Sequence, residues 1–215
     1  MHPQTNVKIC GLSQQAHVNA AVGAGAAYVG FVFFPKSPRN VTVESAKSLA
    51  ESVPPGIQRV ALFVNPADEE IRRVLDEVPI DMIQLHGAES PERVSRVESR
   101  FGLPAMKAVG VKRECDLRRL DDYSAVASQL LVDAKPSEDS KLPGGNGLAF
   151  DWRLIAGRNW RIPWMLAGGL DDSNVATAIR LTGARQVDVS SGVESSPGRK
   201  SPDKILAFVT AAQGG

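Results

Sequence analysis

Short apolar runs, rich in β-branched and aromatic residues, alternate along the chain with longer amphipathic stretches. This alternation is typical of βαβ units with a parallel sheet. Several runs are almost continuously apolar, as expected for strands buried on both faces. Eight runs predict strands: Val7–Cys10, Tyr28–Phe33, Gln58–Val64, Asp81–Leu85, Ala105–Val109, Gln129–Asp133, Trp164–Ala167 and Gln186–Ser190.

Helical periodicity occupies several intervals between these runs. Apolar residues recur at i, i+3, i+4 and i+7 over Ala46–Val53 and Ile71–Val78, which predicts two amphipathic helices. Val94–Phe101 carries a weaker stripe, and Ile205–Val209 predicts a closing helix with Ser201 as its N-cap.

The number of strands favours a closed barrel. Each unit has about 27 residues, enough for one strand, one helix and two short loops. Eight right-handed units can close and remove both sheet edges, whereas an open doubly wound sheet usually has fewer strands. We therefore predict an α/β fold, a (β/α)8 TIM barrel, with residues 1–215 as a single catalytic domain. Length alone also permits two small domains.

Composition narrows the possible partners and surroundings. Hydrophobic residues make up 43% of the chain, and 25 Lys and Arg nearly balance 24 Asp and Glu. Neither nucleic acid nor a membrane surface is therefore favoured as a partner. Cys10 and Cys115 lack metal or redox spacing, and no basic leader precedes a long apolar run. We expect a cytoplasmic protein that is a monomer or a homodimer.

The residues that end the predicted strands are the first candidates for chemistry, because active sites of such barrels lie at the carboxyl ends of the strands. Cys10 ends the first strand, Asp133 ends the sixth, and His86 follows the fourth. Glycine-rich loops after the seventh and eighth strands expose backbone N–H groups, which match a recurrent phosphate site better than tight turns alone. The predicted phosphate-binding residues there are Gly168, Gly169, Ser190, Ser191 and Gly192.

Six short sequence segments contain or flank these candidate residues and follow one another along the chain. They are Lys8–Leu12, Gly30–Phe33 with Lys36–Arg39, Gln84–Gly87, Gly144–Gly147 before Phe150–Trp152, Ala167–Leu170 and Val187–Glu194. Together they resemble the phosphoribosylanthranilate isomerase family of tryptophan biosynthesis, over nearly the whole chain. The resemblance adds Gly145 to the expected phosphate contacts. The loop 134–149 is a candidate active-site lid on its own pattern, because it is a long polar loop after a barrel strand.

The resemblance implies an Amadori rearrangement of N-(5′-phosphoribosyl)anthranilate to 1-(2-carboxyphenylamino)-1-deoxyribulose 5-phosphate. An acid helps to open the furanose ring at its oxygen, and a base removes the proton from C2′ of the resulting Schiff base. The substrate nitrogen is the electron sink, so neither a metal nor an organic cofactor is expected. By similarity, Cys10 is the base and Asp133 is the acid.

Each assignment requires a shifted pKa. An unperturbed thiol is only about 3% thiolate at pH 7, and an unperturbed Asp is almost wholly ionised. The shifts correspond to roughly 2 kcal/mol for Cys10 and 4 kcal/mol for Asp133. Apart from the resemblance, Cys10 reads as a small buried hydrophobe. Asp133 can likewise cap a helix or pair with Lys135.

Three further residues are predicted to bind substrate. Similarity makes Arg39 a contact for the anthranilate carboxylate, although an arginine in a polar loop is ordinarily solvated. His86 is either a substrate contact or a satisfied strand-end histidine. Asp188 faces the interior and needs a partner. Lys8 is the candidate, and its charge could also favour a Cys10 thiolate.

Two other functions compete with this interpretation. One is another enzyme that acts on a sugar phosphate. A metal-dependent epimerase is disfavoured because the three dispersed histidines are too few for its metal site. A histidine-pathway aldose-ketose isomerase would carry a carboxylate in place of Cys10. The other is a non-catalytic phosphate-ligand-binding barrel.

Overall fold

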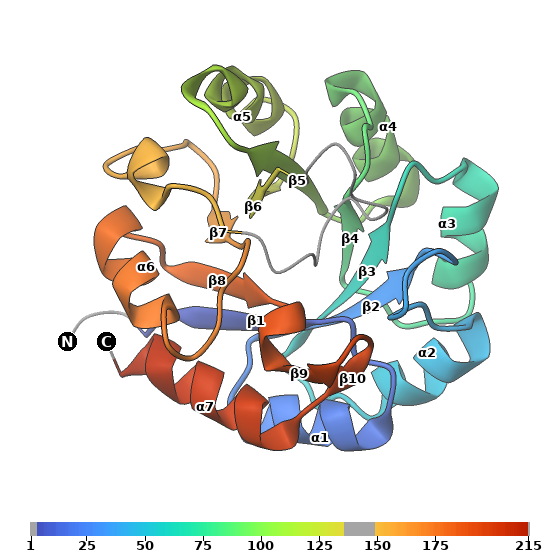
Figure 1. Cartoon of the computed structure of the whole chain (residues 1–215). Helices are drawn as coiled ribbons and strands as arrows, with labels where there is room; N and C mark the ends of the chain where they lie inside the picture. Colours follow the sequence, from blue (N-terminus) through green and yellow to red (C-terminus); the bar gives the residue numbers. More distant parts are fainter. Residues whose placement is uncertain (1–3, 136–148, 215) are drawn as a thin grey trace.

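A closed ring of eight parallel strands forms the centre of the molecule (Figure 1). The computed structural model describes residues 4–135 and 149–214. The strands are β1 Asn6–Cys10, β2 Tyr28–Phe33, β3 Gln58–Phe63, β4 Met82–Leu85, β5 Ala105–Val111, β6 Gln129–Ala134, β7 Trp164–Leu166 and β8 Gln186–Val189. All eight predicted strands are confirmed, with ends that differ by at most about two residues, as boundary assignments commonly do. β1 pairs with β8, which closes the barrel.

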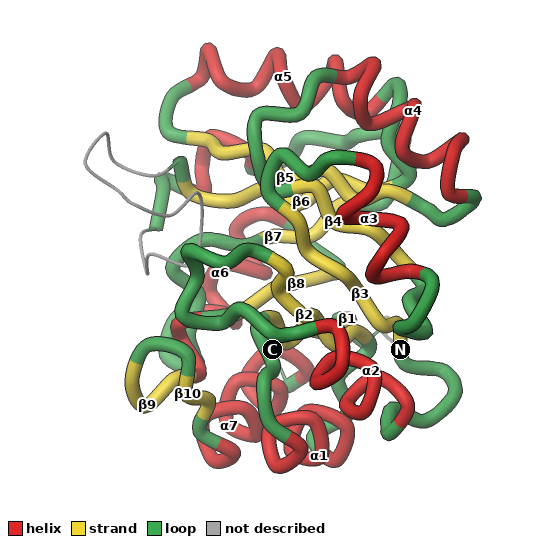
Figure 2. Tube along the Cα trace, turned by 90° about the vertical axis from the view of Figure 1, so that its right-hand side faces the viewer, coloured by secondary structure: helices red, strands yellow, loops and turns green. Residues whose placement is uncertain are grey.

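Helices surround this ring on the outside (Figure 2). The described residues contain α1 Gln15–Gly23, α2 Val43–Glu51, α3 Asp68–Leu75, α4 Pro91–Phe101, α5 Leu117–Ser124, α6 Val175–Thr182 and α7 Pro202–Gln213. The four helices expected from periodicity are present, although α3 ends at Leu75 rather than at Val78. No helix in the described part of the chain is long and apolar enough to cross a membrane.

Local sequence explains where several helices begin. The side chains of Thr42, Ser90 and Ser201 each accept a hydrogen bond from the backbone N–H three residues later. These bonds satisfy donors that have no partner within the helix. Pro91 and Pro202 follow two of these caps, in the first turn where a missing N–H costs nothing.

The connection from β6 to β7 departs from the simple repeat. In its described part it contains one turn of 3₁₀-helix, η2 Trp152–Ile155, where a strict repeat would have an α-helix. Ala156 is the C-cap of this turn, and Gly157 follows it with a φ of 71°. Residues 136–148, which include Gly145 and most of the candidate lid, lie outside the described residues.

Strand parity separates the inside of the barrel from the helical layer. Val7 and Ile9 of β1 belong to the apolar core that the strands share with the helices. Cys10 instead clusters with Val32 and Leu62 inside the barrel. Since side chains alternate along a strand, Lys8 shares the inward face with Cys10.

The connection from β8 to α7 contains a small hairpin that the sequence analysis did not foresee. β9 Glu194–Ser196 pairs in antiparallel fashion with β10 Arg199–Lys200. Pro197 and Gly198 form its turn, a dipeptide that favours turns and could have signalled it. Gly198 has a φ of 82°, and a Cβ there would lie 2.4 Å from the carbonyl oxygen of Pro38. The hairpin therefore packs against the loop after β2.

Candidate active site

Cys10 lies at the carboxyl end of β1 and points into the barrel, where only 4% of the residue is exposed. The neighbouring strand contributes Gly30, which has no side chain. A Cβ at Gly30 would lie 3.1 Å from Sγ of Cys10 and 3.2 Å from Nζ of Lys8. The glycine thus leaves the space in which the thiol and the ammonium group meet.

Lys8 and Asp188 form a buried ion pair beside this thiol. Nζ of Lys8 donates to Oδ1 of Asp188 at 2.8 Å, across the β1–β8 junction. The prediction that Lys8 is the partner of Asp188 is confirmed. Burial by itself lowers the pKa of Lys8, but its interactions with the Asp188 carboxylate and with Cys10 outweigh this effect and raise that pKa above its ordinary value. Lys8 is therefore held as a cation next to Cys10.

The thiol itself is governed mainly by its burial. Burial raises the pKa of Cys10, and the charge of Asp188 adds to this rise. Lys8 lowers that pKa, in the direction expected from the sequence, and Lys200 does so as well. Because burial prevails, the neutral thiol is favoured in the structure without substrate.

Asp133 occupies the inward face at the carboxyl end of β6. Its Oδ1 accepts a hydrogen bond from the backbone N–H of Ala134 at 2.7 Å, and its Oδ2 lies 3.2 Å from Nε2 of His86. Lys135, the partner considered from sequence, pairs with Asp116 instead, at 2.9 Å. His86 therefore lies next to the candidate acid.

A third side chain extends this contact into a chain. Nε2 of Gln84 lies 2.9 Å from Nδ1 of His86. With the amide in this orientation, His86 carries its proton on Nε2 and donates it to Asp133. The opposite amide orientation would make Nε2 an acceptor for a proton held by Asp133. The Gln84–His86–Asp133 chain can thus support both states through which a general acid passes.

The two glycine loops expected to bind phosphate lie in contact with each other. Gly168 and Gly169 have φ values of 88° and 63°, which side-chain-bearing residues rarely adopt. A Cβ at Gly168 would lie 3.1 Å from Oδ1 of Asp133, and one at Gly192 would lie 2.0 Å from the carbonyl oxygen of Leu170. The loop after β8 forms one short 3₁₀-helix, η3 Ser191–Val193. These loops connect the end of β6 to the end of β8 around the barrel mouth.

Replacing Gly192 with Ala tests this contact. The added methyl group must displace the backbone at Leu170, so we expect a loss of about 1–3 kcal/mol in the free energy of unfolding and a raised KM for a phosphorylated substrate. Gly23→Ala is the matched control, because a Cβ at the last residue of α1 meets nothing within 4 Å. It should be neutral or stabilising. Chemical denaturation and steady-state kinetics measure both effects, and equal behaviour of the two variants would contradict the assignment.

Arg39 is buried, with 6% of the residue exposed. This burial rules out the alternative considered from sequence, a solvated loop arginine. Nε donates to Oε1 of Glu194 at 2.7 Å and Nη2 donates to Oε2 at 2.9 Å, a bidentate geometry. Its stem crosses the end of β1, where a Cβ at Gly11 would lie 2.7 Å from Cδ. Arg39 lies beside Cys10 as a result, and it must bridge Glu194 and substrate if it binds the anthranilate carboxylate.

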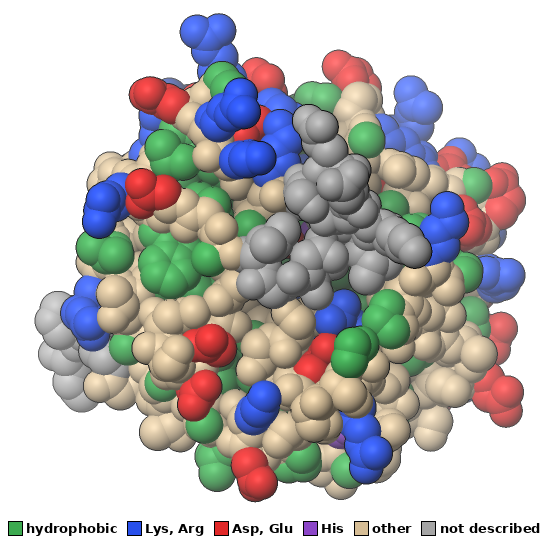
Figure 3. Space-filling model, in the orientation of Figure 1, with side chains coloured by type: hydrophobic (Ala, Val, Ile, Leu, Met, Phe, Trp, Pro, Cys, Tyr) green, Lys and Arg blue, Asp and Glu red, His purple; other side chains and the backbone are tan. Residues whose placement is uncertain are grey.

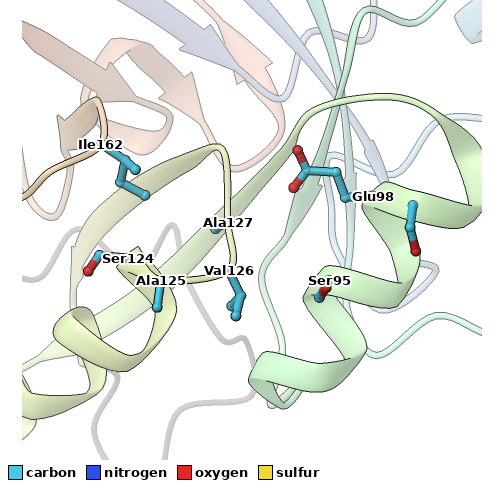
Figure 4. A pocket seen from close by; sticks show the side chains of 8 residues that line it. Ser95, Glu98, Ser124, Ala125, Val126, Ala127 and Ile162 are labelled. Carbon is cyan, nitrogen blue, oxygen red and sulfur yellow. The ribbon is translucent and has the colours of Figure 1, made fainter.

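A hollow of about 350 Å³ lies elsewhere, between α4 and the segment joining α5 to β6 (Figure 4). Ser95, Glu98, Ala127 and Ile162 are among its lining residues. Ala127 and Ile162 precede β6 and β7, so the hollow opens at the amino ends of the strands, away from Cys10 and Asp133.

Figure 3 shows the molecule in the orientation of Figure 1. On this face, Lys and Arg side chains are interspersed with Asp and Glu side chains toward the edge of the molecule.

The closed barrel, with buried ionisable side chains and glycine loops at its carboxyl rim, defines the class of TIM barrels that carry a candidate active site at this rim. Comparison with known proteins refines this class. The family model described as N-(5′-phosphoribosyl)anthranilate (PRA) isomerase matches residues 7–211, and the chain belongs to that family.

Individual relatives agree with this assignment. N-(5′-phosphoribosyl)anthranilate isomerase of Paracoccus denitrificans is 62% identical over 207 residues, which cover 96% of each chain. The crystal structure of the Thermotoga maritima enzyme is 38% identical, covers 98% of this chain and 99% of that one, and has a TM-score of 0.88. A further structure, of a phosphoribosylanthranilate isomerase in complex with reduced 1-(o-carboxyphenylamino)-1-deoxyribulose 5-phosphate, is 37% identical over the same shares, with a TM-score of 0.84.

Proposed function

We propose that this chain converts N-(5′-phosphoribosyl)anthranilate to 1-(2-carboxyphenylamino)-1-deoxyribulose 5-phosphate, with Cys10 as general base and Asp133 as general acid. The observation that carries this proposal is the position of the two side chains. Both are inward-facing residues at the carboxyl ends of their strands, β1 and β6, and two adjoining glycine loops connect these regions of the mouth. The related complex with a reduced product analogue supports the same substrate class.

Asp133 would act first, by giving a proton to the furanose oxygen. Ring opening leaves a positively charged Schiff base, in which C1′ is double-bonded to the anthranilate nitrogen. Cys10 would then take the C2′ proton, while the electron pair of that C–H bond moves toward the nitrogen. The enolamine formed in this step would give the aminoketose when Cys10 returns its proton to C1′ and the C2′ hydroxyl group gives its proton to Asp133, with the help of His86.

The raised pKa of Cys10 in the free protein is compatible with this order of events. Ring opening creates a cationic nitrogen close to the thiol, and an opposite charge within about 4–6 Å favours the ionised form. The same cation makes the C2′ proton more acidic. The thiol would lose its proton to solvent at this stage, and the thiolate would then take the C2′ proton.

The remaining strand-end residues would hold the substrate. Gly168, Gly169, Ser190, Ser191 and Gly192 are proposed to bind the phosphate, with Gly145 as a further contact that lies outside the described residues. Arg39 would hold the anthranilate carboxylate, and Asp188 and His86 would lie close to the sugar. We propose that the protein acts in the cytoplasm, as a monomer or a homodimer, without metal or organic cofactor.

A turnover assay tests the proposed function. Purified protein is supplied with N-(5′-phosphoribosyl)anthranilate, or separately with the aminoaldose substrate of the histidine pathway, each with and without a chelator. The proposal requires rapid conversion of the first compound, unaffected by the chelator. Binding of this compound without conversion would support the non-catalytic alternative. Preference for the second compound would support the histidine-pathway isomerase.

A further inference from the structure

The hairpin after β8 brings a lysine into the barrel mouth. The side chain of Lys200, in β10, is completely buried. Its Nζ lies 2.8 Å from the carbonyl oxygen of Ser190, 3.2 Å from Oγ of Ser190 and 2.8 Å from Oε1 of Glu194. Three acceptors therefore surround one amino group at the end of β8.

This arrangement requires Lys200 to be an ammonium ion. Oγ of Ser190 donates to the carbonyl oxygen of Cys10 at 3.1 Å, so its hydrogen is already used and it accepts from Lys200. Three acceptors need three N–H donors, which only the charged form of a lysine has. Burial holds the pKa of Lys200 below its ordinary value, and the nearby carboxylate of Glu194 opposes this effect in part.

Lys200 thus reaches Cys10 in two ways. Through Ser190 it ties the end of β8 to the backbone of Cys10, and its charge acts on the thiol directly. Lys8 also acts on the thiol, but it is neutralised by Asp188 from β8, and β2 contributes only Gly30. Oε1 of Glu194 accepts from both Lys200 and Arg39, so its negative charge is divided between two cations.

We propose that Lys200 is a positioning residue for the thiol: its buried ammonium group favours the thiolate form of Cys10 and fixes the end of β8 against the end of β1. This inference rests on the proposed role of Cys10 as base. The hairpin β9–β10 then contributes to catalysis, because it is the element that positions Lys200 inside the barrel mouth. Lys200 itself need not touch the substrate.

The test is a titration of the Cys10 thiolate by its ultraviolet absorbance. Cys115 is exposed, so Cys115→Ser is the background for every variant, and Cys10→Ser in that background is the blank. The variants are Lys200→Met, Lys200→Gln and Lys200→Arg. Lys204→Met is the matched control, because Lys204 holds the same hairpin through the carbonyl oxygen of Glu194 at 2.9 Å but has no contact with Ser190 among the described hydrogen bonds.

Loss of the charge should move the titration midpoint upward by about one pH unit in Lys200→Met and Lys200→Gln, because a nearby cation stabilises the thiolate. Lys200→Arg and Lys204→Met should titrate like the background. The acidic limb of kcat/KM should move by the same amount as the thiol in each variant, which lowers turnover near neutral pH about tenfold and restores it at higher pH.

Two results would overturn the inference. One is an unchanged midpoint in Lys200→Gln, which removes the charge but keeps two N–H donors, and the other is a loss of turnover at every pH without movement of the limb. If Lys200→Met does not fold, the test rests on the thiol titration midpoints of Lys200→Gln and Lys200→Arg, which differ in charge. Failure of the proposed function is separate: an active Cys10→Ser variant would remove the role of the base, whereas the thiol titration would still report the effect of Lys200.

Discussion

Replacing Cys10 with Ser is expected to lower kcat by about 10²- to 10⁴-fold, the usual contribution of a positioned general base. Serine fits the site left by Gly30, but its hydroxyl group is far less acidic than a thiol and cannot act as the base near neutral pH. KM should change little, because the glycine loops after β7 and β8 that we propose to bind phosphate remain intact. Steady-state kinetics with N-(5′-phosphoribosyl)anthranilate measures both constants.

The matched control for this variant is Cys115→Ser. Cys115 is the other cysteine of the chain and is exposed, so its replacement should leave kcat and KM as they are. A Cys10→Ser variant that is folded and as active as this control would show that the C2′ proton leaves by another route.

Replacing Asp133 with Asn should lower kcat by a similar factor, about 10²- to 10⁴-fold. The amide has the shape of the carboxyl group, and its oxygen can still accept from the N–H of Ala134. It has no acidic proton to give to the ring oxygen. His86 should remain in place beside it, so the loss is expected in kcat more than in KM.

Asp81→Asn is the control for this second variant. Asp81 lies at the amino end of β4 and is paired with Arg59 at 2.8 Å, far from the barrel mouth. Its replacement should reduce stability slightly and leave kcat unchanged. If both Asp variants were fully active, the ring would open without help from Asp133.

Much of this architecture could be predicted from local pattern. The eight strands follow from alternating apolar runs, and strand parity correctly placed Cys10, Lys8 and Asp188 on the inward face. The Lys8–Asp188 pair was predictable because a buried carboxylate needs a partner, and few inward-facing cations were available. The contacts between the two glycine loops follow from their position after neighbouring strands.

Contacts made by side chains of the loops and of the hairpin could not be predicted in the same way. Arg39 and Glu194 are 155 residues apart, and each side chain alone looks like an ordinary surface charge. Lys200 acquires its role only through the hairpin that folds back over β8. His86 and Asp133 share the inward face, yet their pairing depends on how the strands are staggered around the barrel, which a single sequence does not specify.

The kinetic isotope effect of deuterium at C2′ most directly tests the assignment of Cys10 as the base and Asp133 as the acid. Turnover of substrate deuterated at C2′ is compared with that of unlabelled substrate in Cys10→Ser and in Asp133→Asn. We expect a large isotope effect in Cys10→Ser, where removal of the C2′ proton limits the rate, and an effect near unity in Asp133→Asn, where ring opening limits it. Equal isotope effects in the two variants, or the reverse order, would contradict the assignment of base and acid.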